Sequence, residues 1–329
     1  MGIAECTVDI SNYGWFNAAL VAQLITCLLG AIGSSLSLWC LLTCRYIQTG
    51  MKIQLGLFFS IILVLCAVAL PGDVVVEYGS WLCWDETLSV KLTFVGLYTI
   101  LVALERNIFA GMAVYRLVAV FSPQKYKVVS RWAVVTAVEV SICLSVLLLW
   151  TPIFVMQNTR SGSDLNNPSS FPGGLTLYCV VFLFPIVVTV LAYVLLIIKM
   201  KLRRQKAEQS SGMRSTWNEQ VNFAVGVLIL TNLLLDVPHI TVHLLDESSK
   251  DLSFILIHVV YRLHLALDPF IFIGLNSHYR RKILRRLVSC CPGCANFASG
   301  ALGTTTAESS SRRPDSVGLK VHPSCSTQV

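Results

Sequence analysis

LGLFFSIILVLCAVALP, residues 55–71, is a stretch of the chain without a single charged side chain. An apolar stretch of roughly 20 residues forms a helix long enough to cross a hydrocarbon core of about 30 Å. Similar runs recur along the chain, separated by charged or Pro-, Gly- and Ser-rich breaks. They predict seven spans, at 18–43, 53–76, 88–115, 132–156, 174–198, 218–245 and 252–274. The predicted fold class is an all-α membrane protein, a seven-transmembrane helix bundle.

The composition of the whole chain supports the same fold class. Of its 329 residues, 55% are hydrophobic and 13% are charged, whereas soluble domains carry roughly 25% charged residues. This composition excludes a water-soluble fold of this length. The 12 cysteines are scattered and follow neither a disulfide framework nor the spacing of a zinc site. We therefore expect no metal and no cofactor.

Lysine and arginine residues between the spans gather on one side of the predicted bundle. Seventeen follow spans one, three, five and seven, against three on the other side. Because basic loops remain cytoplasmic, the N-terminus is predicted outside and the C-terminus inside, in a multi-pass protein of the plasma membrane. The outer side carries ten carboxylates, which form either a solvated loop surface or a mouth that attracts cations.

The chain divides into four parts. Residues 1–17 form the outer N-terminus, and residues 18–275 form the membrane bundle. Residues 276–289 contain NSHYRRKILRRLV, a basic amphipathic helix that we expect to lie in the membrane interface. Cys290 and Cys291 follow it and are placed for palmitoylation. The Ser- and Thr-rich tail, 290–329, is predicted to be disordered, and its hydroxyls either accept phosphate or are simply solvated.

Ionisable residues inside the predicted spans are expensive in a bilayer and mark functional or structural pairing. Span three carries Glu105 and Arg106. Spans six and seven carry polar stripes at helical spacing, which consist of Asn232, Asp236, His239, His243, Tyr261, His264 and Asp268, with Arg262 adjacent. We expect an interior network with Arg106 near Asp236, and Glu105 near His264 or Arg262. Such pairs either serve function or merely fix helix packing. Glu139 in span four has no evident partner.

Four motifs, in the expected order and on the expected spans, resemble the rhodopsin-like (class A) G-protein-coupled receptors over about residues 18–290. They are Arg116 within YRLVAVFSPQKY (115–126), Pro185 followed by Tyr193, Pro238 in span six, and Asp268-Pro269-x-x-Phe272, which is similar to the NPxxY motif. A single motif match is weak evidence for the family, whereas four matches in the same order and on the same spans are strong evidence.

The chain also departs from the family pattern. Tyr115 replaces the acid before the conserved arginine, and span two lacks the sodium-binding aspartate. Asp236 and Asn232 occupy the two aromatic positions of span six. The resemblance implies a disulfide between Cys83 and Cys179. The distances of these cysteines along the chain from Arg116 and Pro185 differ from those in the family, so both the bonded and the free forms remain open. No subfamily is indicated: span seven has no lysine for a retinal Schiff base, and Tyr98 stands where amine receptors keep an aspartate.

The resemblance implies a ligand-operated switch that activates a heterotrimeric G protein. Span six would swing outward, with Pro185 and Pro238 as hinges, and open a cleft for a G-protein helix. The residues implied in coupling are Tyr115, Arg116, Tyr193, Asp268, Pro269 and Phe272. The residues implied in an outer ligand pocket are Tyr98, Val102, His239, His243, Tyr261 and Arg262. Arrestin and a receptor kinase would bind the Ser/Thr tail, and no nucleic-acid partner is expected.

Three alternatives remain open at this point. A receptor-like protein that is constitutively active or does not signal would fit the lost motifs. A transporter would use Glu105, Arg106, Asp236, His264 and Asp268 as a charge relay, although the sequence has no inverted repeat of the kind that transporters show. An intramembrane enzyme is disfavoured because no catalytic motif is present, so we expect no enzymatic activity.

Overall fold

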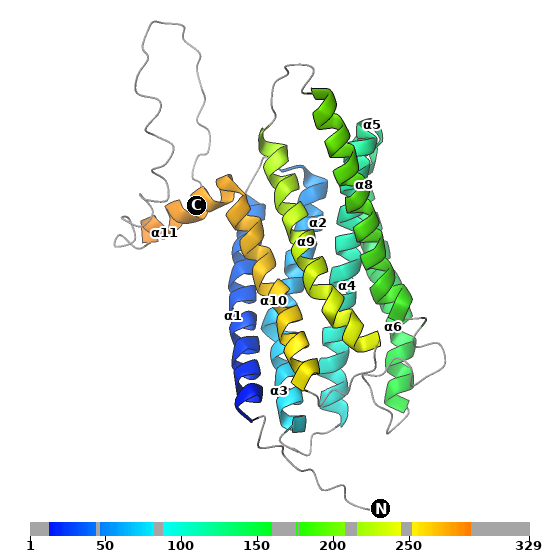
Figure 1. The fold of residues 1–329 in the computed structure, drawn as a ribbon, viewed down its shortest axis with the longest axis vertical. Helices are drawn as coiled ribbons and strands as arrows, with labels where there is room; N and C mark the ends of the chain where they lie inside the picture. Colours follow the sequence, from blue (N-terminus) through cyan, green and yellow to red (C-terminus); the bar gives the residue numbers. More distant parts are fainter. Residues whose placement is uncertain are drawn as a thin grey trace, which may run out of the picture. The chain divides into compact units, whose positions relative to one another are not determined.

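A computed structural model describes residues 13–43, 47–81, 88–159, 176, 178–207, 216–244 and 252–290 of the chain. All regular structure in these residues is helical, and seven helical stretches are long and apolar enough to cross a membrane. Figure 1 shows the helices from α1 to α10 running side by side. The predicted set of seven apolar helices is confirmed.

The first four spans are α-helical, and the second one also contains a π-helical turn. The helices are α1 (Tyr13–Thr43), then α2 (Thr49–Val64), the π-helical turn η2 (Leu65–Ala69) and α3 (Leu70–Trp81) for the second span, α4 (Leu88–Phe121), the short α5 (Pro123–Val129), and α6 (Trp132–Thr159). The third helix is six residues longer than predicted, so Arg116 lies inside α4 rather than after it. Ser122 ends it because Pro123 has no N–H to continue the ladder and instead starts α5.

The remaining helices follow the predicted order. They are the π-helical turn η4 (Cys179–Leu183) with α8 (Phe184–Ala207), α9 (Thr216–Leu244), α10 (Leu252–Leu275) and α11 (Ser277–Cys290). Both π-helical turns end two residues before a proline, η2 before Pro71 and η4 before Pro185. A proline inside a helix clashes with the carbonyl of residue i−4, and a widened turn directly before it accommodates that clash.

The bundle is held by close contacts between helices that are distant in sequence. α1 packs along α10 and α2, α4 packs against α6 and α8, and α9 packs against α10. Gly33 sets the approach of α1 to α10, because a Cβ at this position would lie 2.9 Å from Cβ of Pro269. Ser37 on the same helix donates a hydrogen bond to the carbonyl of Pro269 at 3.5 Å. The backbone of α1 therefore lies directly against the turn of α10 that contains Asp268 and Pro269.

The outer surface of the bundle is apolar, although several charged side chains are buried inside it. Leu148 on α6 is 73% exposed and Leu234 on α9 is 66% exposed, whereas Asp268 is 0% exposed. Large contiguous apolar surfaces of this kind are rare on soluble monomers and suit contact with lipid chains. Together with the seven apolar helices, they indicate a multi-pass membrane protein.

The C-terminal helix α11 (Ser277–Cys290) belongs from His278 onward to a second unit of the chain. Its arginines at 280, 281, 285 and 286 are exposed, and Ile283 and Leu284 are half-buried. The predicted helix at 276–289 is therefore present as a basic amphipathic helix. Cys290 ends α11, while Cys291 and the tail lie outside the described residues.

Candidate functional site

The interior of the bundle contains a buried ion pair between α4 and α9. Arg106 Nη2 lies 2.5 Å from Asp236 Oδ1, and the two side chains are 6% and 10% exposed. The same Nη2 lies 3.3 Å from Nδ1 of His239. The guanidinium also stacks over the rings of Phe182 and Tyr261, at 5.5 and 5.2 Å from the ring centroids. The charge is thus neutralised by one carboxylate and further stabilised by two aromatic faces. The expected pairing of Arg106 with Asp236 is present.

The neighbouring residue on α4 reaches α10 instead. His264 Nε2 lies 3.1 Å from Glu105 Oε1, and His264 Nδ1 lies 2.5 Å from the carbonyl oxygen of Tyr261. Since a carbonyl can only accept, Nδ1 must donate to it. Nε2 then either donates to a carboxylate, which makes the ring an imidazolium, or accepts from a protonated Glu105. In both forms the pair shares one proton. Of the two partners predicted for Glu105, His264 is the observed one.

The buried acid of α10, Asp268, is bound by α9. Asn232 Nδ2 lies 3.0 and 2.9 Å from the two carboxylate oxygens of Asp268 and also donates to the carbonyl of Leu228 at 3.0 Å. Asp268 is completely buried and Asn232 is 9% exposed. The amide of Asn232 on α9 therefore supplies the donor that the buried carboxylate of Asp268 needs.

Arg262 on α10 joins four helices. Its Nη2 lies 2.5 Å from Asp73 Oδ2, its Nη1 lies 3.2 Å from Glu77 Oε2, and Nη1 also donates to Gln23 Oε1. Its Nε lies 3.4 Å from the hydroxyl of Tyr98, and the guanidinium carbon lies 4.9 Å from the centroid of that ring. The partners come from α1, α3 and α4.

Asp73 and Glu77 are two of the ten outer carboxylates, and of the two alternatives for that set the solvated loop surface does not hold for this pair. Both lie on α3, and Asp73 is only 7% exposed. The spacing carried a usable signal, because residues four apart lie on one face of a helix. The predicted span ended at residue 76, and this boundary separated the two acids.

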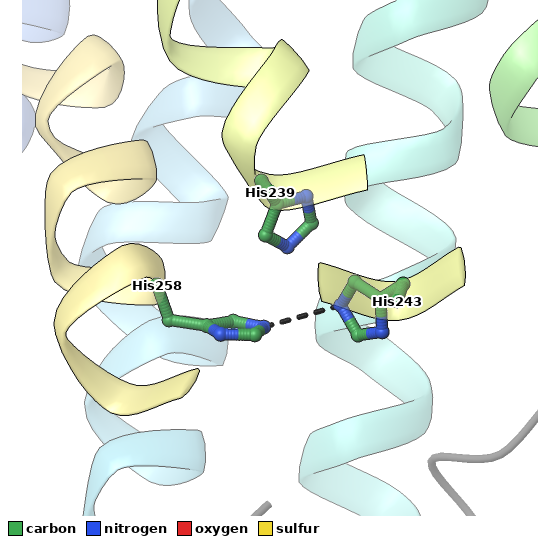
Figure 2. Close-up of side chains that lie close together, drawn as sticks. All are labelled: His239, His243 and His258. Carbon is green, nitrogen blue, oxygen red and sulfur yellow. Dashed lines mark hydrogen bonds between the residues drawn. The ribbon is translucent and has the colours of Figure 1, made fainter. Parts of the chain in front are cut away.

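Three histidines form a cluster between α9 and α10 (Figure 2). Nε2 of His243 lies 3.2 Å from Nε2 of His258, and the rings of His239 and His258 have their centroids 4.7 Å apart. His258 is absent from the sequence-predicted site. It lies one helical turn before Tyr261 and Arg262, and this periodicity would have placed it on the same face of α10.

The six predicted ligand-pocket residues lie on α4, α9 and α10. Tyr98 contacts Arg262, as described above, and Val102 lies one turn further along α4 with 4% exposure. The ring of His239 stacks on Tyr261, with centroids 3.9 Å apart and an angle of 14°. The set thus contains three contacting pairs, because the rings of His239 and His243 also have their centroids 4.7 Å apart. His243 contacts His258 as well.

The residues of α4 and α8 that are predicted to couple to a G protein differ in the contacts that their side chains make. Arg116 Nη2 lies 2.9 Å from the sulfur of Met51 on α2. Tyr115 is 7% exposed, and its hydroxyl has no hydrogen-bond partner within the described part of the chain. Tyr193 on α8 is 8% exposed and faces Gly226 of α9.

Phe272, the last residue of the DPxxF segment, is completely buried. Its ring lies 5.1 Å from that of Phe59 on α2. In this arrangement it packs inside the bundle, so lining a cleft would require this aromatic contact to open.

Two further predictions concern α6 and the cysteines. Glu139 does have a partner, because Gln54 Nε2 on α2 donates to Glu139 Oε1 at 2.9 Å. Cys179 begins η4 and is a free cysteine, so the predicted disulfide with Cys83, a residue outside the described part of the chain, is not formed in this structure.

The interior of the bundle thus holds paired charges that tie α4 to α9 and α10, and a group of imidazoles with the chemistry to bind a metal ion. Such pairs serve either as a latch between helices or as a path for protons. No family model matches the chain, and no curated protein matches it either.

Proposed function

We propose that this chain is a rhodopsin-like G-protein-coupled receptor, which converts the binding of an extracellular ligand into activation of a heterotrimeric G protein. The four motifs and the seven apolar helices support this assignment. The observation that carries it is the buried Arg106–Asp236 pair, which joins α4 to α9 two residues before Pro238. A latch at a helix kink is the element that a two-state switch requires.

The latch defines what a ligand must do. Removing one partner of a buried ion pair costs about 3–5 kcal/mol, because the other charge remains buried without compensation. A ligand that contacts Arg106 or His239 offsets this cost and releases α9 from α4. Movement of α9 would then let Arg116 and Tyr193 line the cleft for a G-protein helix, whereas Phe272 would join them only if α10 also moved away from Phe59 on α2.

The surroundings of the switch follow from the charge pattern. The basic segment 199–214 would flank the cleft on the cytoplasmic side, with the N-terminus outside the plasma membrane. The amphipathic α11 would lie in the interface, anchored by palmitoylated Cys290 and Cys291. Phosphorylation of the Ser/Thr tail by a receptor kinase would create a charged site for arrestin.

The test is second-messenger signalling without added ligand, in cells that display the chain at the surface. Asp236→Asn removes the latch and should raise agonist-free signalling, and Arg116→Ala should abolish the increase. Leu234→Ala is the matched control, because this side chain is on the same helix and 66% exposed. If Asp236→Asn reaches the surface and no messenger changes in any G-protein class, the proposal fails. A conventional response in the unaltered chain without ligand would identify the constitutively active form.

A proton-coupled transporter is the second candidate, and the adjacent Glu105–His264 and Asn232–Asp268 contacts favour it. These side chains place a shared proton and a second buried acid between α4, α9 and α10. The chain reconstituted in liposomes with a pH-sensitive dye would separate the two functions. A transporter moves protons in a manner that Glu105→Gln abolishes, and a receptor moves none.

A further inference from the structure

The histidine cluster has the form of a metal site. His239 and His243 lie one helical turn apart on α9, and His258 faces them from α10 (Figure 2). Each ring offers one nitrogen, and these three nitrogens all lie within 4.8 Å of one another. His239 and His258 are each 6% exposed, and His243 is half-buried. Two ligands four residues apart on one helix and a third from its neighbour are a common way to hold Zn²⁺.

The spacing of the nitrogens is close to that of a tetrahedral site. Zn–N distances of about 2.0–2.1 Å require ligand nitrogens about 3.3 Å apart. The Nε2 atoms of His243 and His258 are 3.2 Å apart, so this edge of the tetrahedron is already formed. Figure 2 shows one ring nitrogen of His239 pointing toward the other two rings. Since no two of the three nitrogens are more than 4.8 Å apart, a shift of at most about 1.5 Å completes the set.

The hydrogen bond of His258 prepares it as a ligand. Its Nδ1 lies 2.8 Å from the carbonyl oxygen of Phe254, which can only accept. Nδ1 therefore carries the proton, and Nε2 presents its lone pair toward His243. A hydrogen bond from the other ring nitrogen of a histidine to a backbone carbonyl fixes the tautomer at metal sites and raises the basicity of the ligand nitrogen.

The cations near the cluster are already neutralised. Arg106 is paired with Asp236, and Arg262 is paired with Asp73 and Glu77. Arg106 also approaches Nδ1 of His239 at 3.3 Å, and a guanidinium can only donate. A metal on the other nitrogen of His239 requires a proton on Nδ1, so metal binding displaces Arg106 from this contact.

We propose that His239, His243 and His258 bind one Zn²⁺ ion, with the fourth position open to water or to a ligand group. Imidazole nitrogens suit Zn²⁺, Cu²⁺ and Ni²⁺, and Zn²⁺ tolerates the open tetrahedral geometry best. The ion bridges α9 to α10 near the end of the bundle where Phe16 of α1 packs on Ile255 of α10. This site does not depend on the proposed receptor function, because it concerns binding alone.

The experiment measures Zn²⁺ binding to the purified full chain, without a polyhistidine tag, in detergent micelles at neutral pH. Competition with a chromophoric chelator gives stoichiometry and affinity. We expect one tightly bound Zn²⁺ per chain. His243→Asn or His258→Asn should weaken binding by at least about 10- to 100-fold, because loss of a residue that merely hydrogen-bonds to a ligand already costs that much. His243→Cys should retain binding because a thiolate also ligates Zn²⁺. His278→Asn on α11 is the matched control and should change nothing.

Cobalt substitution tests the site without any mutation. Co²⁺ bound by three imidazoles gives the visible bands of a tetrahedral site without thiolate charge transfer, whereas binding to any of the 12 cysteines adds such bands. Thiolate bands in the unaltered chain, fewer than one Zn²⁺ per chain, or equal affinity in the chain that lacks all three histidines would each overturn the proposal. If the variants fail to fold, the cobalt spectrum of the unaltered chain decides.

Discussion

Arg106 on α4 and Asp236 on α9 form an ion pair of 2.5 Å in which both side chains are at most 10% exposed. Each charge is therefore separated from water and depends on the other. Glu105, the neighbour of Arg106, pairs with His264 on α10, so two adjacent residues of one helix bind two different helices. The relative positions of α4, α9 and α10 are thus coupled through a single turn of α4.

The coupling between Arg106 and Asp236 can be measured by a double-mutant cycle. We expect Arg106→Gln and Asp236→Asn each to lower the free energy of unfolding by about 3–5 kcal/mol, because each leaves a buried charge alone. The double variant should lose much less than the sum. The measurement is thermal unfolding of the purified chain, with Leu234→Ala as the control on α9. Strictly additive losses would show that the pair does not act as a unit.

The proton shared by Glu105 and His264 predicts a contrast between two substitutions. In Glu105→Gln, a neutral His264 can still donate from Nδ1 to Tyr261 and accept the amide N–H of Gln at Nε2, so the loss should be within about 1 kcal/mol. Glu105→Leu leaves His264 without its polar partner and should cost at least about 1–3 kcal/mol. Unfolding of both variants in one detergent gives the comparison, and equal losses would contradict the shared-proton arrangement.

Arg262 predicts a rescue experiment. Arg262→Met leaves Asp73 buried and unpaired beside Glu77, and we expect a loss of about 3–5 kcal/mol. Adding Asp73→Asn to this variant should recover part of the loss, because an amide is cheaper to bury than a carboxylate. The loss in Arg262→Lys should be smaller than that in Arg262→Met but not zero. A lysine keeps the charge, but it lacks the planar guanidinium that contacts both acids and Tyr98. No recovery in the double variant would mean that Asp73 is not the main partner.

The approach of α1 to α10 predicts opposite results at two glycines. A Cβ at Gly33 would lie 2.9 Å from Pro269, whereas a Cβ at Gly56 meets nothing within 4 Å. Gly33→Ala should therefore destabilise the bundle by about 1–3 kcal/mol through overpacking. Gly56→Ala should be neutral or stabilising by up to about 1 kcal/mol, because alanine has the higher helix propensity. Similar melting temperatures for the two variants would contradict the close contact.

His278, outside the membrane-spanning helices, gives a prediction of pH dependence. Partial burial, and then the nearby Lys282 and Arg285, lower its pKa below the ordinary 6.5. The folded α11 therefore binds this proton less readily than the unfolded chain. The contribution to helix stability is fully present above pH 6.5 and is lost as the pH falls below 6.5 and through the lower pKa of the folded state. NMR titration of the imidazole in the full chain checks this, with His278→Asn to assign the signal. A midpoint above 6.5 would contradict it.

The polar residues inside the spans could be found from the sequence, but their partners could be found only in part. The sequence correctly predicts the pairing of Arg106 with Asp236, because an acid and a base at the depth of the bilayer need each other. It does not predict the partners of Arg262 and Glu139. Asp73 lay close to a predicted span end, and Gln54 is uncharged, so neither had the local signal of an intramembrane ion.

Local composition determined that this chain forms seven apolar helices and a basic amphipathic one, because hydropathy and helical periodicity are properties of neighbouring residues. The tertiary structure alone decided that Arg262 binds Asp73 rather than Glu105, that His258 joins the two histidines of α9, and that Phe272 packs on Phe59. These contacts depend on the rotation of each helix about its axis and on which helices are adjacent. Packing across the whole bundle sets both, so no single segment encodes them.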